Sequence, residues 1–362
     1  MNVSEFRTGL REWLDTNDLS AEPGLGLDGQ VAQLARVRRA LYDAGWMRYG
    51  WPAETGGLGG PAVLRAVLGE EVATRDLAEP GIYSMIEVLA PTMISYARPE
   101  LAEQMVPLLL SGREQWCQGF SEPGSGSDLA SLTTKAAARG GDWVINGQKV
   151  WTSLAQFASR CVLLTRTAPG HDGITAFFVD MDTPGITVRP LRTMHGVDEF
   201  AEVYFDDVVV PGERMLGRPG DGWRVAMDLL PHERSTCFWH RIAYLFTRLD
   251  RILAQTTIDD DTALGSAYLA LHTARCRSHR TQQRLAGGAT LGAETSIDKV
   301  LLATAEQQLF DTARDLLPGV LELTDDEWRT EYLYSRAATI YGGTAEIQRN
   351  IIARRLLDLG KD

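Results

Sequence analysis

Helical spacing dominates both ends of the chain. In SEFRTGLREWL, VAQLARVRRALYDAG and PELAEQMVPLLLSG, apolar residues recur three and four positions apart, as on one face of an α-helix. A glycine-rich stretch, YGWPAETGGLGG, interrupts these segments and is expected to form a loop. Helical spacing returns after GRPGDGW and continues to the end of the chain. Residues 1–112 and 217–362 are therefore predicted to be helical.

The middle of the chain has a different pattern. From about 113 to 216, short β-rich runs are bounded by Gly, Pro, Asn and Asp: DWVINGQKVWTS, CVLLTRT, ITAFFVDMD, ITVRPL and AEVYFDDVVVP. This order of elements predicts a mainly α protein with an inserted β-barrel or sheet, divided into domains at 1–112, 113–216 and 217–362. Asn146-Gly147 predicts a hairpin turn that directs Trp151 and Ser153 along the following strand.

The composition of the chain argues against several classes of function. The 362 residues, 44% of them apolar, suit two or three packed domains, and the net charge of −12 without a cluster of Lys and Arg argues against nucleic acid as a partner. No apolar run approaches the ~20 residues that cross a bilayer, and the N-terminus lacks the apolar core of a signal peptide. Scattered cysteines and histidines indicate neither a disulfide framework nor a metal site. A cytoplasmic location is expected.

Three stretches could carry chemistry. WCQGFSEPGSGSDLASLTTK, residues 116–135, is either an ordinary surface turn or a loop whose N–H groups bind a polar or anionic ligand. Trp151, in INGQKVWTS, could lie in the core or form a platform for a cofactor. TIYGGTAEIQRNIIARR, residues 339–355, could be a plain glycine loop, or a helix start that holds a phosphate.

Together these stretches resemble the acyl-CoA dehydrogenase family. FSEPGSGSD, NGQKVW and YGGTAEIQRNIIARR occur there in this order and at these distances, as do GWPAETGGLGG, DTPGITVRPL and VYFDDVVVPGERMLGRPGDGW. The resemblance covers nearly the whole chain. It implies an N-terminal helical domain, a central β-barrel and a C-terminal four-helix bundle, with FAD between barrel and bundle. It also implies removal of the α-proton of an acyl thioester, transfer of a β-hydride to flavin N5, and passage of electrons to an electron-transferring flavoprotein.

The resemblance also implies the cofactor site. The loop that contains Phe120, Ser121, Gly126 and Ser127 should line the flavin ring and its phosphates. Trp151 should pack against the isoalloxazine, and Ser153 should face N5. Thr344 and Glu346 should lie near the cofactor, while the backbone N–H of Gly342 should hold the thioester carbonyl, an oxyanion-hole role.

The position of the catalytic base differs between branches of this family. In the common branch of the family, the first position of the glycine pair is the catalytic glutamate, but here it is Gly342. A second branch, which includes isovaleryl-CoA dehydrogenase, carries its base on the first helix after the barrel; the matching stretch GWRVAMDLLPHERSTCFWHRI supplies Glu233, followed by Arg234. Glu233 is therefore predicted to be the base, although a surface glutamate paired with an arginine would look the same. Pro231 could kink the helix and redirect Glu233, and His232 is expected to be a spectator.

Two family motifs are missing. RxxFG is absent from RLDRILAQTTIDDDTALGSAY, and QxxGGxG is replaced by PGVLELTDDEWRTEYLY. Both would complete the FAD site of a neighbouring subunit. ETSIDKVLLATAEQQLFDTARDLLPG resembles bacterial relatives with shortened bundles, which often form heteromers. A homo-oligomer with a remodelled FAD pocket and a heteromer with a related subunit are both consistent with these losses.

The main hypothesis is an FAD-dependent acyl-thioester dehydrogenase that uses Glu233. Its substrate would be an acyl-CoA or an acyl-carrier-protein thioester, and Gly342 leaves room for a branched or bulky acyl group. One alternative is a flavin oxidase or monooxygenase on the same fold. The other is a non-catalytic partner subunit of a heteromeric dehydrogenase.

Overall fold

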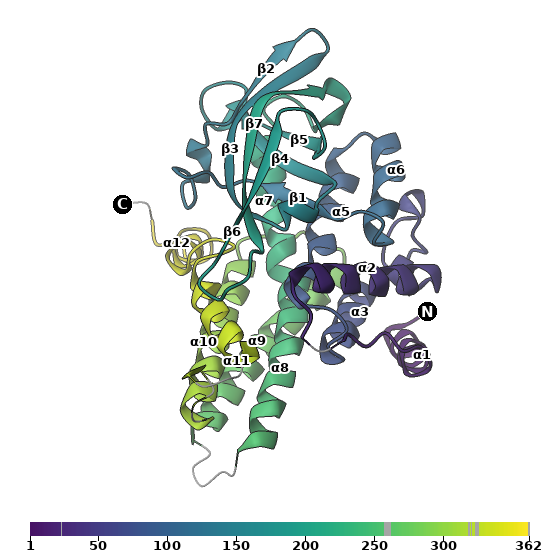
Figure 1. Cartoon of the computed structure of the whole chain (residues 1–362), viewed down its shortest axis with the longest axis vertical. Coiled ribbons are helices and arrows are strands. Elements are labelled where there is room, and N and C mark those ends of the chain that lie inside the picture. Colours follow the sequence, from purple (N-terminus) through teal and green to yellow (C-terminus); the bar gives the residue numbers. More distant parts are fainter. Residues whose placement is uncertain (23, 257–261, 318, 320, 323–325, 361–362) are drawn as a thin grey trace.

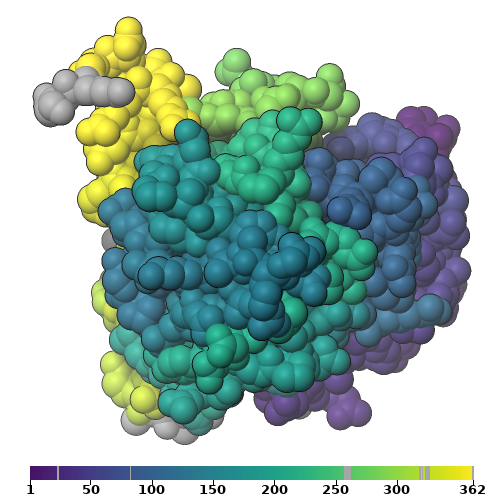
Figure 2. Space-filling view, turned by 90° about the horizontal axis from the view of Figure 1, so that it is seen from above, coloured from purple at the N-terminus to yellow at the C-terminus, as the bar shows by residue number. Residues whose placement is uncertain are grey.

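The computed structural model describes residues 1–362 except 23, 257–261, 318, 320, 323–325 and 361–362. The predicted fold class is confirmed: helices, then a curled β-sheet, then helices again. In Figure 1 the sheet caps one end of the molecule, with the N-terminal helices on one side and the long C-terminal helices below it. Seen from above, the sheet covers the centre of the molecule, between the N-terminal helices and the C-terminal residues drawn in yellow (Figure 2).

The N-terminal part is helical. Its helices are α1 (Val3–Thr16), α2 (Leu27–Asp43), α3 (Val63–Thr74), α4 (Pro80–Tyr83), α5 (Met85–Tyr96) and α6 (Pro99–Leu110). The first helix illustrates why the spacing predicts them: Asn2 and Glu5 form a capping box at its start, and Phe6, Leu10 and Leu14 bury one face. One short 3-10 turn, Trp46–Arg48, precedes the glycine-rich loop before α3, and a second, Ala53–Thr55, lies within it.

The middle part is one eight-stranded sheet. Its strands are β1 (Trp116–Gly119), β2 (Lys135–Arg139), β3 (Asp142–Ser153), β4 (Arg160–Arg166), β5 (Ile174–Asp180), β6 (Ile186–Leu191), β7 (Phe200–Pro211) and β8 (Met215–Leu216). They are ordered β6-β7-β3-β2-β4-β5-β8, and β1 pairs with β4. We refer to this curled sheet as the barrel.

The hairpin predicted at Asn146-Gly147 is wrong, because β3 runs straight through both residues. The turn before β3 lies at residues 140–141 instead. A Cβ built on Gly147 would lie 2.7 Å from the Cα of Thr134, and the pairing with β7 shifts register between Ile145 and Gly147. Glycine therefore permits a bulge and a close backbone approach within the strand. The Asn146 side chain is used across strands, where its Nδ2 donates to Asp207.

The C-terminal part is a helical bundle. It consists of α7 (Gly222–His232), a π-helical segment (Glu233–Cys237), α8 (Phe238–Gln255), α9 (Thr262–Ala286), α10 (Thr295–Leu316), α11 (Asp326–Ser335) and α12 (Ala345–Arg355). Helix α10 is central and packs against α8, α9, α11 and α12. Of the two stretches that lack family motifs, the parts at 257–261, 318, 320 and 323–325 lie outside the described residues. Within the described part of the chain, no helix is long and apolar enough to cross a membrane.

Candidate active site

Glu233 and Gly342 meet in space. Gly342 has a φ of +62°, in the left-handed region that favours glycine. A Cβ built on it would lie 2.6 Å from Oε1 of Glu233, so the Glu233 carboxylate occupies the place where a side chain at 342 would begin. The two chain positions that the family resemblance offers for a base therefore converge on one point.

Pro231 does not turn Glu233 away from this point. Helix α7 continues through Pro231, and the π-helical segment starts two residues later. The N–H of Glu233 donates to the carbonyls of Leu229 and Leu230. Proline removes one helical hydrogen bond, and a locally widened turn lets the helix continue. Burial lowers the pKa of the neighbouring His232 to about 4, so this imidazole is neutral at pH 7.

The glycine pair is fixed through its carbonyls. Arg234 donates to the carbonyl of Gly342 from Nη2 at 3.0 Å, and Nε2 of Gln348 donates to the carbonyls of Gly342 and Gly343 at 3.1 and 3.2 Å. Among the described residues, none accepts a hydrogen bond from the N–H of Gly342. The carbonyls of the glycine pair are therefore held, while the N–H of Gly342 has no acceptor within the described part of the chain. Gln348 is a site residue that sequence reasoning missed, although it lies within the motif.

Two further predicted residues, Thr344 and Glu346, lie at the start of α12 in different environments. Thr344 caps the helix, and its Oγ1 accepts from the N–H of Ile347 at 3.2 Å. Glu346 has a side chain that is 78% exposed and lies 4.0 Å from Arg349. Its carboxylate is therefore held on the outer face of α12 and does not compete with Glu233 for the space beside Gly342.

The loop from Phe120 to Ser127 is anchored by a buried ion pair that the sequence did not reveal. Nζ of Lys149, which is fully buried on β3, lies 2.8 Å from Oε1 of Glu122 and donates to the carbonyl of Phe120 at 3.0 Å. Glu122 also accepts from the N–H groups of Thr133 and Thr134, at 2.7 and 2.9 Å. The loop is thus tied to the barrel from both sides.

The ionisation of this pair follows from its surroundings. Burial opposes the charged form of Glu122, but Lys149 and the bonds from Thr134 outweigh it and lower the pKa of Glu122 to about 2. Burial lowers the pKa of Lys149 to about 8, against the opposing attraction of Glu122. Near neutral pH both groups are charged.

The predicted residues of this loop have different environments. Phe120 is buried, and the carbonyl of Ser121 accepts from the N–H of Val150 on β3 at 2.9 Å. Ser127 is exposed, and a Cβ built on Gly126 would meet no atom within 4 Å. The tip of the loop therefore has open space around its backbone, while its base is anchored.

Trp151 lies on the surface of the barrel and not in the core. Its side chain is 59% exposed, its φ of +59° lies in the left-handed region, and its ring meets Phe200 edge-on at 5.9 Å between centroids. The buried Oγ1 of Thr152 has no hydrogen-bond partner among the described residues. Ser153, two residues beyond Trp151, is half-buried and pairs with Phe200. An exposed indole beside an unpaired hydroxyl group is the arrangement expected where a flat ligand is held.

Aromatic rings connect the barrel to the glycine pair. His195 meets Tyr334 of α11 edge-on at 5.5 Å, and Tyr334 lies 5.9 Å from Tyr341, the residue before Gly342. Trp151 contacts Phe200, the first residue of β7, and β7 follows His195 closely along the chain. Trp151 and the Glu233–Gly342 pair therefore both border the junction between barrel and bundle.

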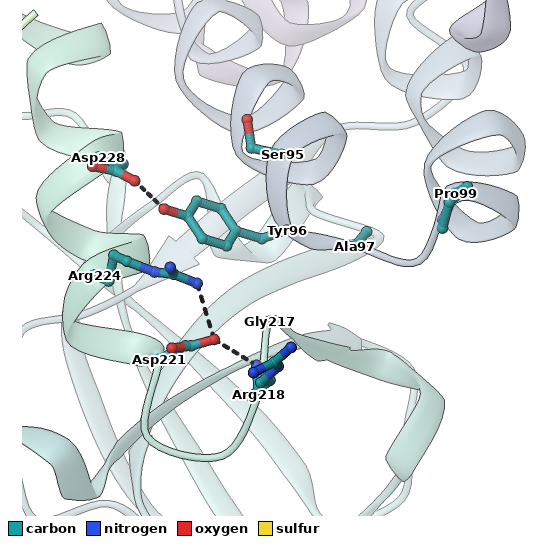
Figure 3. Close-up of a pocket in the computed structure, with 9 residues that line it drawn as sticks. All are labelled: Ser95, Tyr96, Ala97, Pro99, Gly217, Arg218, Asp221, Arg224 and Asp228. Carbon is teal, nitrogen blue, oxygen red and sulfur yellow. Dashed lines mark hydrogen bonds and ion pairs between the residues drawn. The ribbon is translucent and has the colours of Figure 1, made fainter. Parts of the chain in front are cut away.

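A separate hollow lies between the end of α5 and the start of α7 (Figure 3). It is lined by Ser95, Tyr96, Ala97, Pro99, Gly217, Arg218, Asp221, Arg224 and Asp228. The Tyr96 hydroxyl donates to Asp228, and Asp221 accepts from Arg224 and from the N–H of Arg218. None of the predicted site residues lines this hollow. Its bonds tie the N-terminal helices, the end of the barrel and α7 together.

Comparison with known proteins defines the class. Three domain descriptions of one family match the chain: "Acyl-CoA dehydrogenase, N-terminal domain" over residues 5–113, "middle domain" over 117–208 and "C-terminal domain" over 220–357. The chain therefore belongs to the acyl-CoA dehydrogenase family. Members of this family are flavoprotein oxidoreductases that carry out FAD-dependent dehydrogenation of acyl-CoA substrates.

Individual relatives agree with this assignment. Acyl-CoA dehydrogenase IpdE1 of Mycobacterium tuberculosis is 38% identical over 383 residues, which cover 100% of this chain and 99% of that protein. Among solved structures, the ChsE4-ChsE5 complex from the same organism is 27% identical with a TM-score of 0.85, and it covers 99% of this chain and 98% of the matched one. The Tcur3481-Tcur3483 steroid ACAD is 25% identical with a TM-score of 0.86 at the same coverage.

Proposed function

We propose that this protein desaturates an acyl thioester between its α- and β-carbons, with Glu233 as the base that takes the α-proton. The observation that carries the proposal is the position of the Glu233 carboxylate, 2.6 Å from where a side chain at Gly342 would begin. The N–H of Gly342 would donate a hydrogen bond to the thioester carbonyl oxygen and stabilise the negative charge that develops there. Arg234 and Gln348 would hold that N–H in place by binding the carbonyls of the glycine pair.

The residues of the barrel fit a flavin. Trp151 would lie against the ring system, with Ser153 beside it and the unpaired hydroxyl of Thr152 as a further hydrogen-bonding group. Gly126 and Ser127, at the open tip of the anchored loop, would face the ring and the phosphates, with Phe120 and Ser121 behind them. Thr344 would border the cofactor from the bundle. Bound FAD supplies the acceptor for the hydride, and an electron-transferring flavoprotein would receive the electrons.

The substrate is proposed to be a bulky acyl thioester carried by CoA. Glycine at 342 and a base on the α7–α8 helix leave space that a glutamate side chain at 342 would fill. The steroid ACAD that matches 99% of this chain is named for a polycyclic substrate class, which supports an acyl group of that size. An acyl-carrier-protein thioester is the alternative donor of the same group.

The assembly is proposed to be a heteromer in the cytoplasm, in which a related subunit completes the FAD site. Two observations support it: RxxFG and QxxGGxG are absent from the chain, and two similar structures are named as pairs, ChsE4-ChsE5 and Tcur3481-Tcur3483. Each protomer would keep the division into domains at 1–112, 113–216 and 217–362.

The first test is a visible absorbance spectrum of the chain purified alone and after co-expression with a related subunit. Flavin bands that appear only in the co-expressed sample support the heteromer. Flavin bands in the chain purified by itself support a homo-oligomer. Anaerobic addition of a polycyclic acyl-CoA should bleach the flavin band. A flavin that is reduced by the thioester and then reoxidised rapidly by oxygen would instead indicate an oxidase, and no bleaching in either sample would indicate a non-catalytic subunit.

A further inference from the structure

A buried lysine lies next to the turn that carries the glycine pair. Lys299 of α10 is only 2% exposed, and its Nζ donates to the carbonyl of Ala338 at 2.6 Å. The same Nζ lies 3.9 Å from the ring centroid of Tyr341, a cation–π contact. A Cβ built on Gly342 would lie 3.7 Å from Cε of Lys299. Lys299 and Glu233 thus both approach the point where a side chain at 342 would begin.

Of the anionic groups that act on Lys299, Glu233 is the one not already paired with another cation among the described residues. Glu233 and Arg234 from the π-helical segment and Glu306 from α10 act on the ammonium group. Glu306 already has a cation, since Arg241 lies 2.8 Å from it. In the described part of the chain, no cation lies within 4.0 Å of the Glu233 carboxylate, so its charge is balanced at longer range by Lys299 and Arg234.

We propose that Lys299 is a positioning residue, which holds the Tyr341–Gly342 turn against Glu233 and keeps that carboxylate ionised until it accepts the α-proton. The proposal rests on the function proposed for Glu233. A carboxylate must be ionised to act as a base, and burial against an acyl chain opposes ionisation. A fixed positive charge nearby counteracts burial. In the reaction, the α-proton moves from the substrate carbon to Glu233, and Lys299 keeps its own proton throughout.

The pKa of Lys299 supports this role. Burial lowers it to about 8, against the opposing attraction of Glu233 and Glu306. Lys299 is therefore charged at neutral pH and loses its charge in the mildly alkaline range. Arginine at the same position would keep its charge there, because its pKa is above ~12.

The test compares pH profiles of kcat/KM for the assembled, flavin-loaded enzyme with three substitutions. Lys299→Met removes the bond and the charge, Lys299→Gln removes the charge but keeps a donor, and Lys299→Arg keeps the charge. We expect the acidic limb to move to higher pH by about one unit in the two neutral variants and to stay in place in the arginine variant. Lys135→Met, an exposed lysine of β2, is the control and should leave the profile unchanged.

A second readout is independent of turnover. The carboxylate band of Glu233, assigned in infrared spectra by its loss in Glu233→Gln, should titrate at higher pH in Lys299→Gln than in the parent protein. A uniform loss of kcat/KM at every pH, with the band unmoved, would overturn the proposal and leave Lys299 a packing residue. Full activity of Glu233→Gln would refute the proposed base itself, and that result is distinct from any outcome at Lys299.

Discussion

The carboxylate of Glu233 lies against the bare α-carbon of Gly342. Glu233 lies in the π-helical segment and Gly342 in the turn before α12, and only one of the two positions can carry the carboxylate group. A Cβ at 342 would approach Oε1 of Glu233 to 2.6 Å, closer than non-bonded atoms tolerate. The Glu233 carboxylate therefore fits at this place only because residue 342 has no side chain. Glycine at 342 and glutamate at 233 form a matched pair, and changes at either position should affect the other.

Glu233→Gln should lower kcat by ~10²–10⁴-fold, the usual cost of losing a general base. Glutamine has nearly the same shape, so the Gly342 turn and the flavin should be retained. The measurement is the rate of anaerobic flavin reduction by an acyl-CoA in a stopped-flow instrument. Glu346→Gln alters the rival carboxylate of the glycine motif, which is exposed on α12, and should change the rate by less than about tenfold. The opposite ranking of the two variants would assign the base to Glu346.

Gly342→Ala should disturb the site for two independent reasons. Its φ of +62° strains a residue with a Cβ, and that Cβ would push the Glu233 carboxylate aside. We expect a loss of thermal stability of ~1–3 kcal/mol and a fall in kcat larger than the rise in KM. Gly265→Ala in α9 is the matched control, because a Cβ there meets no atom within 4 Å and helical alanine is favourable. An unchanged kcat in Gly342→Ala would show that the carboxylate tolerates displacement.

Apolar spacing predicted the helices and the longer strands because this signal is local. The choice of Glu233 came from the family resemblance, in which glycine at 342 leaves the usual position of the base empty, and its role as base stays a prediction. Contacts between distant segments were not predictable in this way. Lys149 and Glu122 read as ordinary charged residues, and only the pairing of a strand with a loop shows that they form a buried pair. Asn146-Gly147 was misread because the dipeptide also suits a bulge, and the choice depends on the approach of Thr134.

Glu122→Gln should loosen the loop that is proposed to bind FAD. Removing one partner of a buried ion pair leaves the other charge uncompensated, at a cost of ~3–5 kcal/mol. Lys149 would lose its carboxylate partner, while the carbonyl of Phe120 would remain as a neutral acceptor. The expected results are a lower midpoint of thermal unfolding and at least a tenfold weaker FAD affinity, measured by the quenching of flavin fluorescence in apoprotein titrations.

The double variant Glu122→Leu with Lys149→Met distinguishes charge from packing. It removes both buried charges, so it should recover part of the stability that either single change loses. FAD affinity should remain reduced, because Thr133 and Thr134 lose the acceptor that positions the end of the loop. If the double variant is less stable than both single variants, the attraction between Glu122 and Lys149 contributes more stability than the burial of the two charges costs.

Glu199 should make the protein less stable as pH rises through the neutral range. Burial raises its pKa to about 8, with help from Glu79 and against Arg241, and its Oε1 has no hydrogen-bond partner among the described residues. Between its ordinary value of 4.5 and about 8, the folded protein binds more protons at this site than the unfolded chain. The free energy of unfolding therefore falls as pH increases across this window.

Glu199→Gln should remove this fall, because glutamine is neutral at every pH. Relative to the parent, the variant should gain ~1–3 kcal/mol between pH 5 and pH 8, the scale of an unsatisfied buried polar group. Urea unfolding at pH 5, 6.5 and 8 measures the difference, and Glu213→Gln, at an exposed position of the barrel, provides the baseline. His195 lies 3.9 Å from Glu199, but burial lowers its pKa, so the imidazole is neutral across the upper part of this window. A difference that stays constant with pH would mean that Glu199 is already ionised at pH 5 and that the junction between barrel and bundle accommodates its charge.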